Sequence, residues 1–139
     1  MANYEGKTRT NYFRVKDEEY FKNVISYMGA TTGTVEYWTK QEDNQTYYAF
    51  GCTRSLLGIY KIEKEDFDFD EAINLLQSLV HEEDAIIMLE VGYRNLEFVD
   101  ACSTIITSNS IDYLNLMHSS IEKAKELLNN KDYEPECSY

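Results

Sequence analysis

The segment 63–71 holds the residue types best suited to chemistry in this chain. Six of its nine residues are carboxylates: Glu63, Glu65, Asp66, Asp68, Asp70 and Glu71. Aspartates at alternate positions are typical of the start of a calcium-binding loop, but Glu71 stands where that loop needs glycine, and Gln77 stands where it needs glutamate. The pattern therefore predicts no metal site. It fits either a solvated connection into a helix or an acidic ridge that binds a cationic partner.

Two further acidic groups extend this pattern. Glu82, Glu83 and Asp84 form one group, and Asp132, Glu134 and Glu136 form the other. Alternate residues on a strand stand about 6.6 Å apart, which matches the spacing of nucleic acid phosphates to within a factor of ~2. Carboxylates in such an array can occupy a groove that normally holds nucleic acid, and a basic partner relieves their mutual repulsion.

The charge of the chain divides at Lys61. Residues 1–61 carry eight Lys or Arg against seven Asp or Glu, a net of +1, whereas residues 62–139 carry five against eighteen, a net of −13. This asymmetry predicts that the second half forms a continuous acidic surface for a partner of opposite charge. The overall charge of −12 also opposes direct binding to nucleic acid or to anionic lipid.

The first half offers a different kind of site. It has a local basic patch made of Lys7, Arg9, Arg14, Lys16 and Lys22. A predicted hairpin adds the aromatic residues Tyr37, Trp38 and Tyr47. Arg9, Arg14 and Lys16 with these aromatics could bind a small ligand or a nucleotide, in a homodimeric sensor or sponge. The simpler interpretation is that these cations neutralise neighbouring carboxylates within the fold.

Residues suited to catalysis are few. His81 and His118 are the only histidines, and neither spacing predicts a nucleophile–base pair. Glycine-rich phosphate loops are absent, and Cys52, Cys102 and Cys137 form no paired-cysteine motif, which predicts free thiols and no zinc site. We therefore expect a binding protein that is not an enzyme and needs no cofactor.

Targeting and membrane signals are also missing from the sequence. The first eleven residues contain no apolar run, which predicts no signal peptide. The longest apolar run, 85–89, is too short to span a bilayer. We expect a cytoplasmic protein.

Hydrophobic periodicity predicts the elements of the first half. Residues 8–16 alternate as a strand, with Phe13 and Val15 facing the core. Asp17 then caps a helix that ends at Gly29 and whose apolar residues repeat at helical spacing: Phe21, Val24, Ile25 and Met28. A hairpin of 34–40 and 46–52 follows, and 58–63 is a predicted third strand.

The second half repeats this order. Asp68 or Asp70 caps a helix with the apolar stripe Phe69, Ala72, Ile73, Leu76, Leu79 and Val80. Strands are expected at 85–91, 97–107 and 111–114. A last helix, 115–128, is expected to bury Met117, Ile121, Ala124 and Leu128.

A helix followed by a three-stranded meander thus occurs twice, in 17–63 and in 69–114, which is consistent with a duplication. The predicted fold class is α+β, a mostly antiparallel sheet with about three helices packed on one face. A length of 139 residues fits one domain, which we place at 1–130. Residues 131–139 are expected to form an acidic, mobile tail.

Two segments resemble proteins of a known kind. RTNYFRVKDEEYF (9–21) and AIIMLEVGYRNLEFVDACSTIIT (85–107) are similar to small accessory proteins carried by phages and mobile elements of Gram-positive bacteria. Some of those proteins are antirestriction or anti-CRISPR factors, and several are acidic. The resemblance implies a phage or mobile-element setting and assigns no functional residue.

The leading hypothesis joins the resemblance to the charge pattern. We expect an inhibitor that uses the carboxylates of 63–71 and 82–84 to engage the basic, nucleic-acid-binding surface of a host defence protein. Exposed tyrosines would serve as anchors. Binding of this kind should weaken steeply with salt.

Overall fold

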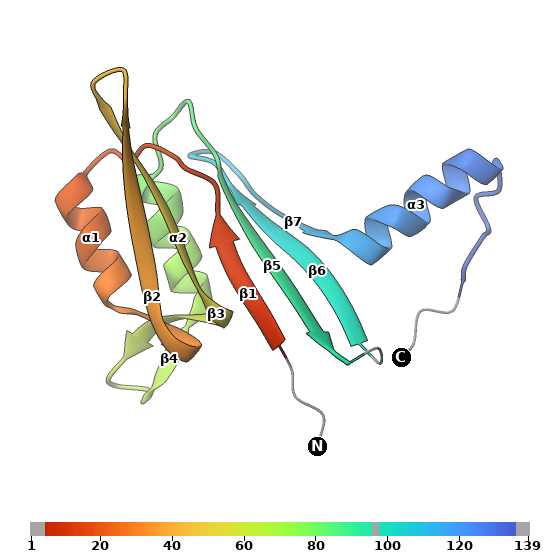
Figure 1. The fold of residues 1–139 in the computed structure, drawn as a ribbon, viewed down its shortest axis with the longest axis horizontal. Coiled ribbons are helices and arrows are strands. Elements are labelled where there is room, and N and C mark those ends of the chain that lie inside the picture. Colours follow the sequence, from red (N-terminus) through yellow and green to blue (C-terminus); the bar gives the residue numbers. More distant parts are fainter. Residues whose placement is uncertain (1–4, 96–97, 136–139) are drawn as a thin grey trace.

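The structure, a computed structural model, describes residues 5–95 and 98–135. Its elements in chain order are β1 (Glu5–Thr10), α1 (Glu18–Ser26), β2 (Met28–Glu42), β3 (Gln45–Lys61), β4 (Asp66–Asp68), α2 (Phe69–Leu79), β5 (Ile86–Arg94), β6 (Phe98–Ile106), β7 (Ile111–Asn115) and α3 (Leu116–Leu128). The α+β class is confirmed (Figure 1). A helix followed by three strands occurs twice in this order, as the sequence predicts, but the third strand of the first copy is β4 and not the predicted 58–63.

Within the described residues, seven strands form one sheet in which each hydrogen-bonded pair is antiparallel. The strand order is β2-β3-β1-β5-β6-β7, with β4 paired to β3. β1 lies between the two meanders, because Thr8 opposes Cys52 of β3 on one side and Glu90 of β5 on the other. The two repeats are therefore placed differently: β1 pairs with the middle strand of the first and with the first strand of the second.

The first strand lies earlier in the chain than predicted. The sequence favours 8–16, whereas β1 ends at Thr10 and the next residues make only two isolated bridges, Phe13 to Tyr48 and Val15 to Val80. The predicted inward direction of Phe13 is confirmed, since its side chain is fully buried.

The β2–β3 hairpin is longer than predicted because its turn is tighter. Asp43 and Asn44 both have positive φ angles, 53° and 63°, which the two-residue turn of a type I′ hairpin requires. Residues 58–61 continue β3, so the separate strand predicted at 58–63 is wrong. Gly58 has a φ of 118°, and a Cβ there would collide with the backbone of Asp68 in β4.

Carboxylate caps start α1 and α2. Asp17 accepts a hydrogen bond from the Tyr20 backbone N–H at 3.0 Å, and Asp68 accepts one from the Glu71 N–H at 3.0 Å. Asp68, not Asp70, is therefore the cap of α2. The predicted end of α1 at Gly29 is wrong, because that glycine already pairs with Gly58 in the sheet.

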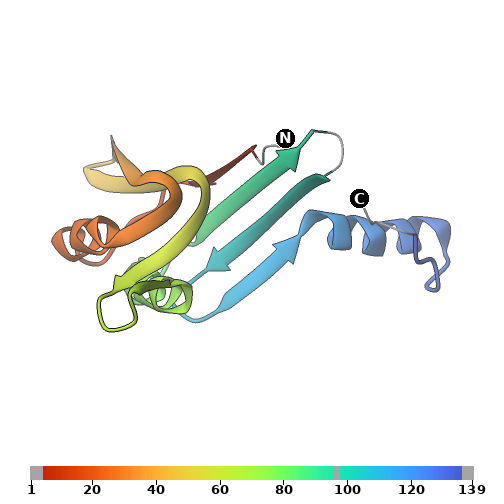
Figure 2. The same cartoon turned by 90° about the horizontal axis from the view of Figure 1, so that it is seen from below.

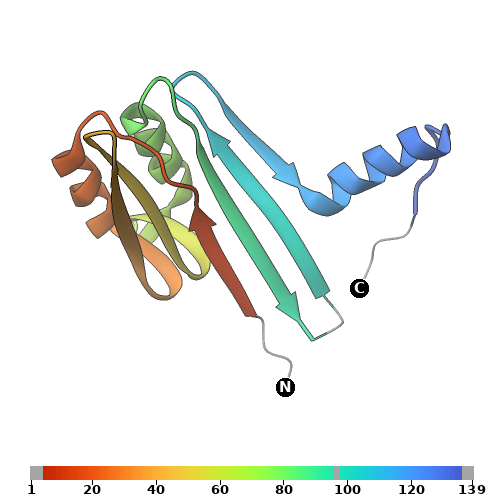
Figure 3. The ribbon, with the colours of Figure 1, turned by 45° about the horizontal axis from the view of Figure 1, so that its top comes forward.

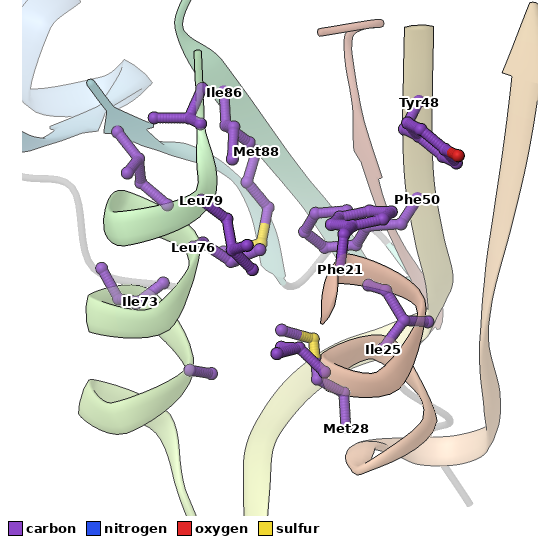
Figure 4. Packing of buried hydrophobic residues seen from close by; sticks show 14 of the residues in the cluster. Phe21, Ile25, Met28, Tyr48, Phe50, Ile73, Leu76, Leu79, Ile86 and Met88 are labelled. Carbon is purple, nitrogen blue, oxygen red and sulfur yellow. The ribbon is translucent and has the colours of Figure 1, made fainter. Parts of the chain in front are cut away.

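Both helices cover the same face of the sheet (Figure 2). Phe21 of α1 lies beside Phe50 of β3, and Leu76 of α2 lies beside Met88 of β5 (Figure 4). Phe13 joins the aromatic part of this core, with its ring edge-on to Phe21 at 5.8 Å and to Phe50 at 6.2 Å. The predicted apolar stripes of α1 and α2 are confirmed within the helices, whereas Met28 is buried as the first residue of β2 and Val80 as the C-cap of α2.

α3 departs from the prediction. Its residues Met117, Ile121, Ala124 and Leu128 were expected in the core, yet no residue of α3 is buried. Figures 1 and 3 show the helix extending away from the sheet beyond β7. Asn115 is both the last residue of β7 and the cap of α3, so no loop exists that could turn the helix back over the sheet. Two helices of the described chain, not three, pack on the sheet.

The tail predicted at 131–139 is described as far as Pro135. In this part, Glu134 forms an ion pair with Lys125 of α3 at 2.6 Å. Glu136 and Cys137 lie outside the described residues.

Candidate functional site

The face of the sheet opposite α1 and α2, called here the outer face, is open. Residues of β1 alternate between buried and exposed, with Thr8 buried and Arg9 exposed. β5 alternates in the same way, since Met88 is 5% exposed and Leu89 is 50% exposed. Successive side chains of a strand point to opposite faces. Arg9 and Leu89, which are opposite each other in the β1–β5 pairing, therefore lie together on the outer face.

A cavity of about 490 Å³ opens on this face over β1, β2 and β3, and we call it the outer pocket. Its lining is rich in cationic and hydroxyl side chains and contains one tryptophan. The lining residues are Lys7, Thr8, Arg9, Thr32, Gly33, Thr34, Glu36, Trp38, Gly51, Cys52 and Thr53.

Strand register explains the shape of the outer pocket. Gly51 of β3 lies between Arg9 of β1 and Glu36 of β2 in the ladder. Adjacent strands are about 4.8 Å apart, so Arg9 and Glu36 stand roughly 10 Å from each other across the glycine. Because Gly51 has no side chain, the space between them stays open. A Cβ at Gly51 would also lie 2.6 Å from the Thr8 carbonyl oxygen, so the close strand approach favours glycine here.

The two cations of the outer pocket are held by neutral partners. The guanidinium carbon of Arg9 lies 4.2 Å from the centroid of the Trp38 ring, and the Lys7 Nζ donates to the Thr53 hydroxyl at 3.3 Å. Neither forms an ion pair with a carboxylate of residues 5–95 or 98–135 within 4 Å. Stacking on Trp38 fixes the plane of the guanidinium and leaves N–H groups free to bind an anion.

Arg14, the second predicted ligand-binding arginine, has a structural contact instead. Its Nη2 donates to Asp84 Oδ1 at 2.7 Å and its Nε donates to Asp84 Oδ2 at 3.0 Å. Its Nη1 donates to Gln45 at 3.0 Å. Hydrogen bonding to Arg14 lowers the pKa of Asp84 below its usual value. Arg14 therefore ties the chain after β1 to the turn after α2.

The remaining residues of the predicted ligand site are dispersed. Tyr37 packs on the helix side of the sheet, with its ring 6.3 Å from that of Phe21. Tyr47 lies beside Arg14, whose guanidinium carbon is 5.8 Å from the Tyr47 ring centroid. Lys16 is exposed where the chain passes α2, and its backbone N–H bonds to Leu79. Of the six predicted ligand residues, the outer pocket contains Arg9 and Trp38.

Three of the nine carboxylates predicted to bind a partner already have cationic neighbours. Asp84 binds Arg14, Glu71 pairs with Lys61, and Asp68 lies 3.9 Å from Lys64. The hydrogen bond to Glu71 raises the pKa of Lys61. These carboxylates contribute to the fold, since Asp68 also caps α2.

The other six make no such pair within the described chain: Glu63, Glu65, Asp66, Asp70, Glu82 and Glu83. The first four lie around the start of α2, and the last two follow its end (Figure 1). Eleven helical residues, about 16 Å, separate the two groups. Asp132 and Glu134 lie at the far end of α3. The acidic segments that the sequence singled out therefore form three separate groups in the described chain and not one continuous field.

The described cysteines are free thiols on central strands, as predicted. Burial raises the pKa of Cys52 and that of Cys102, which disfavours the reactive thiolate form. Among the described residues, no three His, Cys, Asp or Glu side chains lie together as metal ligands would. The described helices include none whose length and apolar content suit a membrane crossing.

Several residues of the outer pocket were not predicted as site residues. Thr32, Glu36, Gly51 and Thr53 enter it through the pairing of β1, β2 and β3. Alternation on each strand gives the side that these residues face, but the register that aligns them is not visible in the sequence. The glycine in the aromatic segment AFGC was the one local sign of close strand approach.

Comparison of the chain with protein-family models, with curated proteins and with solved structures found no match.

Proposed function

We propose that this chain is a small binding protein that takes up a phosphate-bearing ligand in the outer pocket. The observation that carries the proposal is the pair Lys7 and Arg9, two cations that have no carboxylate partner among the described residues and that line a cavity of a protein whose net charge is −12. In such an acidic chain, most cations are expected to neutralise nearby carboxylates. Two that instead face an open cavity are available to an incoming anion.

The chemistry of the outer pocket favours an oxyanion. Lys7 and Arg9 are two residues apart on one strand, so their Cα atoms stand about 6.6 Å apart on the same face. Charged donors at that separation can both reach one phosphoryl group or two successive ones, and charge-assisted hydrogen bonds are the strongest available to a protein. The hydroxyl groups of Thr32, Thr34 and Thr53 add neutral donors.

Glu36 narrows the class of ligand. A carboxylate accepts hydrogen bonds from hydroxyl groups and repels phosphate. A ligand that places phosphate near Lys7 and Arg9 and sugar hydroxyls near Glu36 satisfies both ends of the outer pocket. A nucleotide has both groups, and its base can contact the Trp38 ring.

Nucleotide binding can be tested by thermal unfolding with a panel of nucleoside mono-, di- and triphosphates and with inorganic phosphate. A nucleotide at about 100 times its Kd stabilises the folded chain by about 2.7 kcal/mol, which corresponds to roughly 10 °C in Tm. Lys7→Gln and Arg9→Gln should each weaken binding at least tenfold in titration calorimetry, because each removes one charge-assisted contact.

The matched control is Lys40→Gln. Lys40 lies on the outer face beside Tyr12, 5.1 Å from its ring centroid, and is not part of the outer pocket. This variant should bind the nucleotide with unchanged affinity. An absent Tm response to the whole panel, or equal losses in all three variants, would contradict the proposal.

A second candidate function rests on Glu63, Glu65, Asp66 and Asp70 around the start of α2, which form no ion pair with another described residue. Like charges gathered without counterions favour a cationic partner, which relieves their repulsion. This candidate keeps the hypothesis of an inhibitor that covers the basic surface of a host defence protein, now confined to one end of α2.

The inhibitor candidate can be tested in a DNA cleavage assay with a restriction or RNA-guided nuclease. The wild-type chain should slow cleavage at low salt, and the double change Asp66→Lys and Asp70→Lys should abolish the effect. Asp68 is left intact because it caps α2, so the fold is preserved. Equal inhibition by the variant and the wild type would rule out these carboxylates as the contact.

A further inference from the structure

α3 has an apolar stripe that the described part of the chain covers only in part, since Ile121 and Ala124 are half-buried and Met117 and Leu128 are exposed. Met117, Ile121, Ala124 and Leu128 recur at i, i+4, i+7 and i+11, so they share one side of the helix. None is buried, and Leu128 is 58% exposed. Isolated helices of this length are marginal in water, and their stability in proteins comes from packing of the apolar side. The helix therefore lacks part of the contact that normally holds such a helix in place.

The sheet has an exposed apolar surface that could pack against such a helix. Its outer face over β5, β6 and β7 carries large apolar side chains that none of the described helices covers, and we call this area the apolar face. Its members are 42–58% exposed and are Ile87, Leu89, Val91, Tyr93, Val99 and Leu114. A hollow of about 210 Å³ lies among Leu89, Leu114 and Leu116, where α3 begins.

The dimensions of α3 and the apolar face match. Thirteen helical residues are about 20 Å long and, with side chains, about 10 Å wide. Nine residues of β5 extend about 30 Å, and three strands at about 4.8 Å spacing are roughly 10 Å across. One helix of this size covers the apolar face. The α3 of the same chain cannot do so, because it continues directly from β7 and leaves the sheet (Figure 3).

We propose that two copies of the chain associate by exchange, with α3 of each copy lying along the apolar face of the other. With one two-fold axis, each α3 is covered by the apolar face of the other copy, and each apolar face by the other copy's α3. Two-fold symmetry is the usual symmetry of a homodimer. This inference goes beyond the ligand proposed for the outer pocket and does not depend on it.

The area available is sufficient for a stable dimer. The six side chains of the apolar face and Met117 and Leu128 of the α3 stripe are 39–58% exposed. At on the order of 100 Å² each, these side chains offer roughly 800 Å² per copy, which equals the area of about 800 Å² per partner in a standard interface.

Charge also permits this contact between two acidic chains. The four charged residues of α3 sum to zero, and they pair within the helix as Lys123 with Glu126 and Lys125 with Glu122. The members of the apolar face are uncharged. The net charge of −12 therefore resides mainly on surfaces outside the proposed interface.

The mass of the full-length chain in solution tests the exchange, measured by sedimentation equilibrium from about 1 to 100 μM. The wild-type chain should sediment at twice 16.3 kDa. Leu128→Lys on α3 and Leu89→Lys on the apolar face should each shift the midpoint of association at least tenfold toward higher concentration. Both side chains are exposed in the single chain, so circular dichroism should show the folded state in each variant.

An equimolar mixture of these two variants gives a result particular to exchange. In the mixed pair, the intact α3 of the Leu89→Lys copy meets the intact apolar face of the Leu128→Lys copy. One of the two contacts is then complete, so the mixture should associate more tightly than either variant alone. Glu126→Gln, on the opposite side of α3 from the stripe, is the control and should remain dimeric.

Three results would overturn the inference. A wild-type chain that is monomeric up to 100 μM would show that a second copy of the chain does not cover these surfaces. If Leu89→Lys leaves the midpoint of association unchanged, the dimer is held by contact between the two α3 helices alone. A mixture no tighter than its components would exclude the reciprocal arrangement.

Discussion

Asp84 connects two parts of the molecule that are 70 residues apart in the sequence. One carboxylate oxygen accepts from the backbone N–H of Arg14 at 2.7 Å and the other from its guanidinium at 2.7 Å. The contact fixes the segment after β1 against the turn between α2 and β5. It also removes Arg14 from the set of cations that could bind a ligand, which leaves Lys7 and Arg9 in that role.

The Arg14–Asp84 pair should make stability depend on pH in acid. The pKa of Asp84 is lower in the folded chain than its usual value of about 3.9 in the unfolded chain. Its stabilising effect is therefore complete above about pH 4 and is lost as the pH falls through the lowered pKa. Asp84→Asn should lower Tm by roughly 5 °C at neutral pH.

This difference should shrink below about pH 4, because the protonated carboxyl then resembles the amide. Scanning calorimetry of both proteins at on the order of five pH values between pH 2 and pH 7 measures this difference in Tm. Glu83→Gln, a neighbour without an ion pair in the described chain, should leave Tm unchanged. A constant difference between wild type and Asp84→Asn at all pH values would contradict the assignment.

At the residue scale, the sequence predicted part of the candidate site. Arg9 and Trp38 were identified by type, as a cation on a strand and an aromatic on a hairpin. Gly51 and Glu36 were not, because they join the site through strand register, which depends on distant residues. Tyr37 was placed in the wrong site for a related reason. Successive side chains of its strand face opposite sides of the sheet, and the sequence does not show which of these sides α1 covers.

At the scale of elements, local spacing predicted most helices and strands. The apolar repeats of α1 and α2 and the caps Asp17 and Asp68 are properties of a few adjacent residues. Strand partners are not local, and the central position of β1 between β3 and β5 had no sequence signal. The two-residue turn at Asp43 and Asn44 differs from the prediction, because strands at 34–40 and 46–52 leave the five residues 41–45 between them.

α3 shows the limit of pattern-based prediction most clearly. Its apolar spacing correctly predicted a helix, but amphipathicity does not say which surface the helix covers. The segment 85–91 gave a complementary sign, since both faces of that strand are apolar. One face lies under α2, and the other is the apolar face. A strand that is apolar on both sides needs two covering layers, and the single chain supplies one.

At the scale of the whole molecule, charge and apolar surface are separated. The carboxylates of 63–71 and 82–84 that lack cationic partners in the described chain lie around the two ends of α2. The outer face carries the basic outer pocket over β1–β3 and the apolar face over β5–β7. A dimer formed through the apolar face leaves the acidic ends of α2 outside the contact.

Exchange of α3 predicts that the stability of the molecule depends on protein concentration. Only folded chains associate, so a higher protein concentration favours the folded dimer over the unfolded chain. The Tm of such a dimer therefore rises with concentration. The wild-type Tm should increase by several degrees between about 1 and 100 μM. Leu128→Ala should reduce this increase, because Leu128 is 58% exposed in the single chain and meets apolar surface only in the dimer.

Leu76→Ala provides the contrast for that measurement. Leu76 is fully buried against β5 within one chain, so its truncation should cost about 2–5 kcal/mol and lower Tm at every concentration. The two leucines are chemically identical and both lie on helices. If Leu128→Ala also lowers Tm equally at all concentrations, then Leu128 stabilises the single chain, and α3 packs within its own copy. If its effect appears only at high concentration, the contact lies between copies.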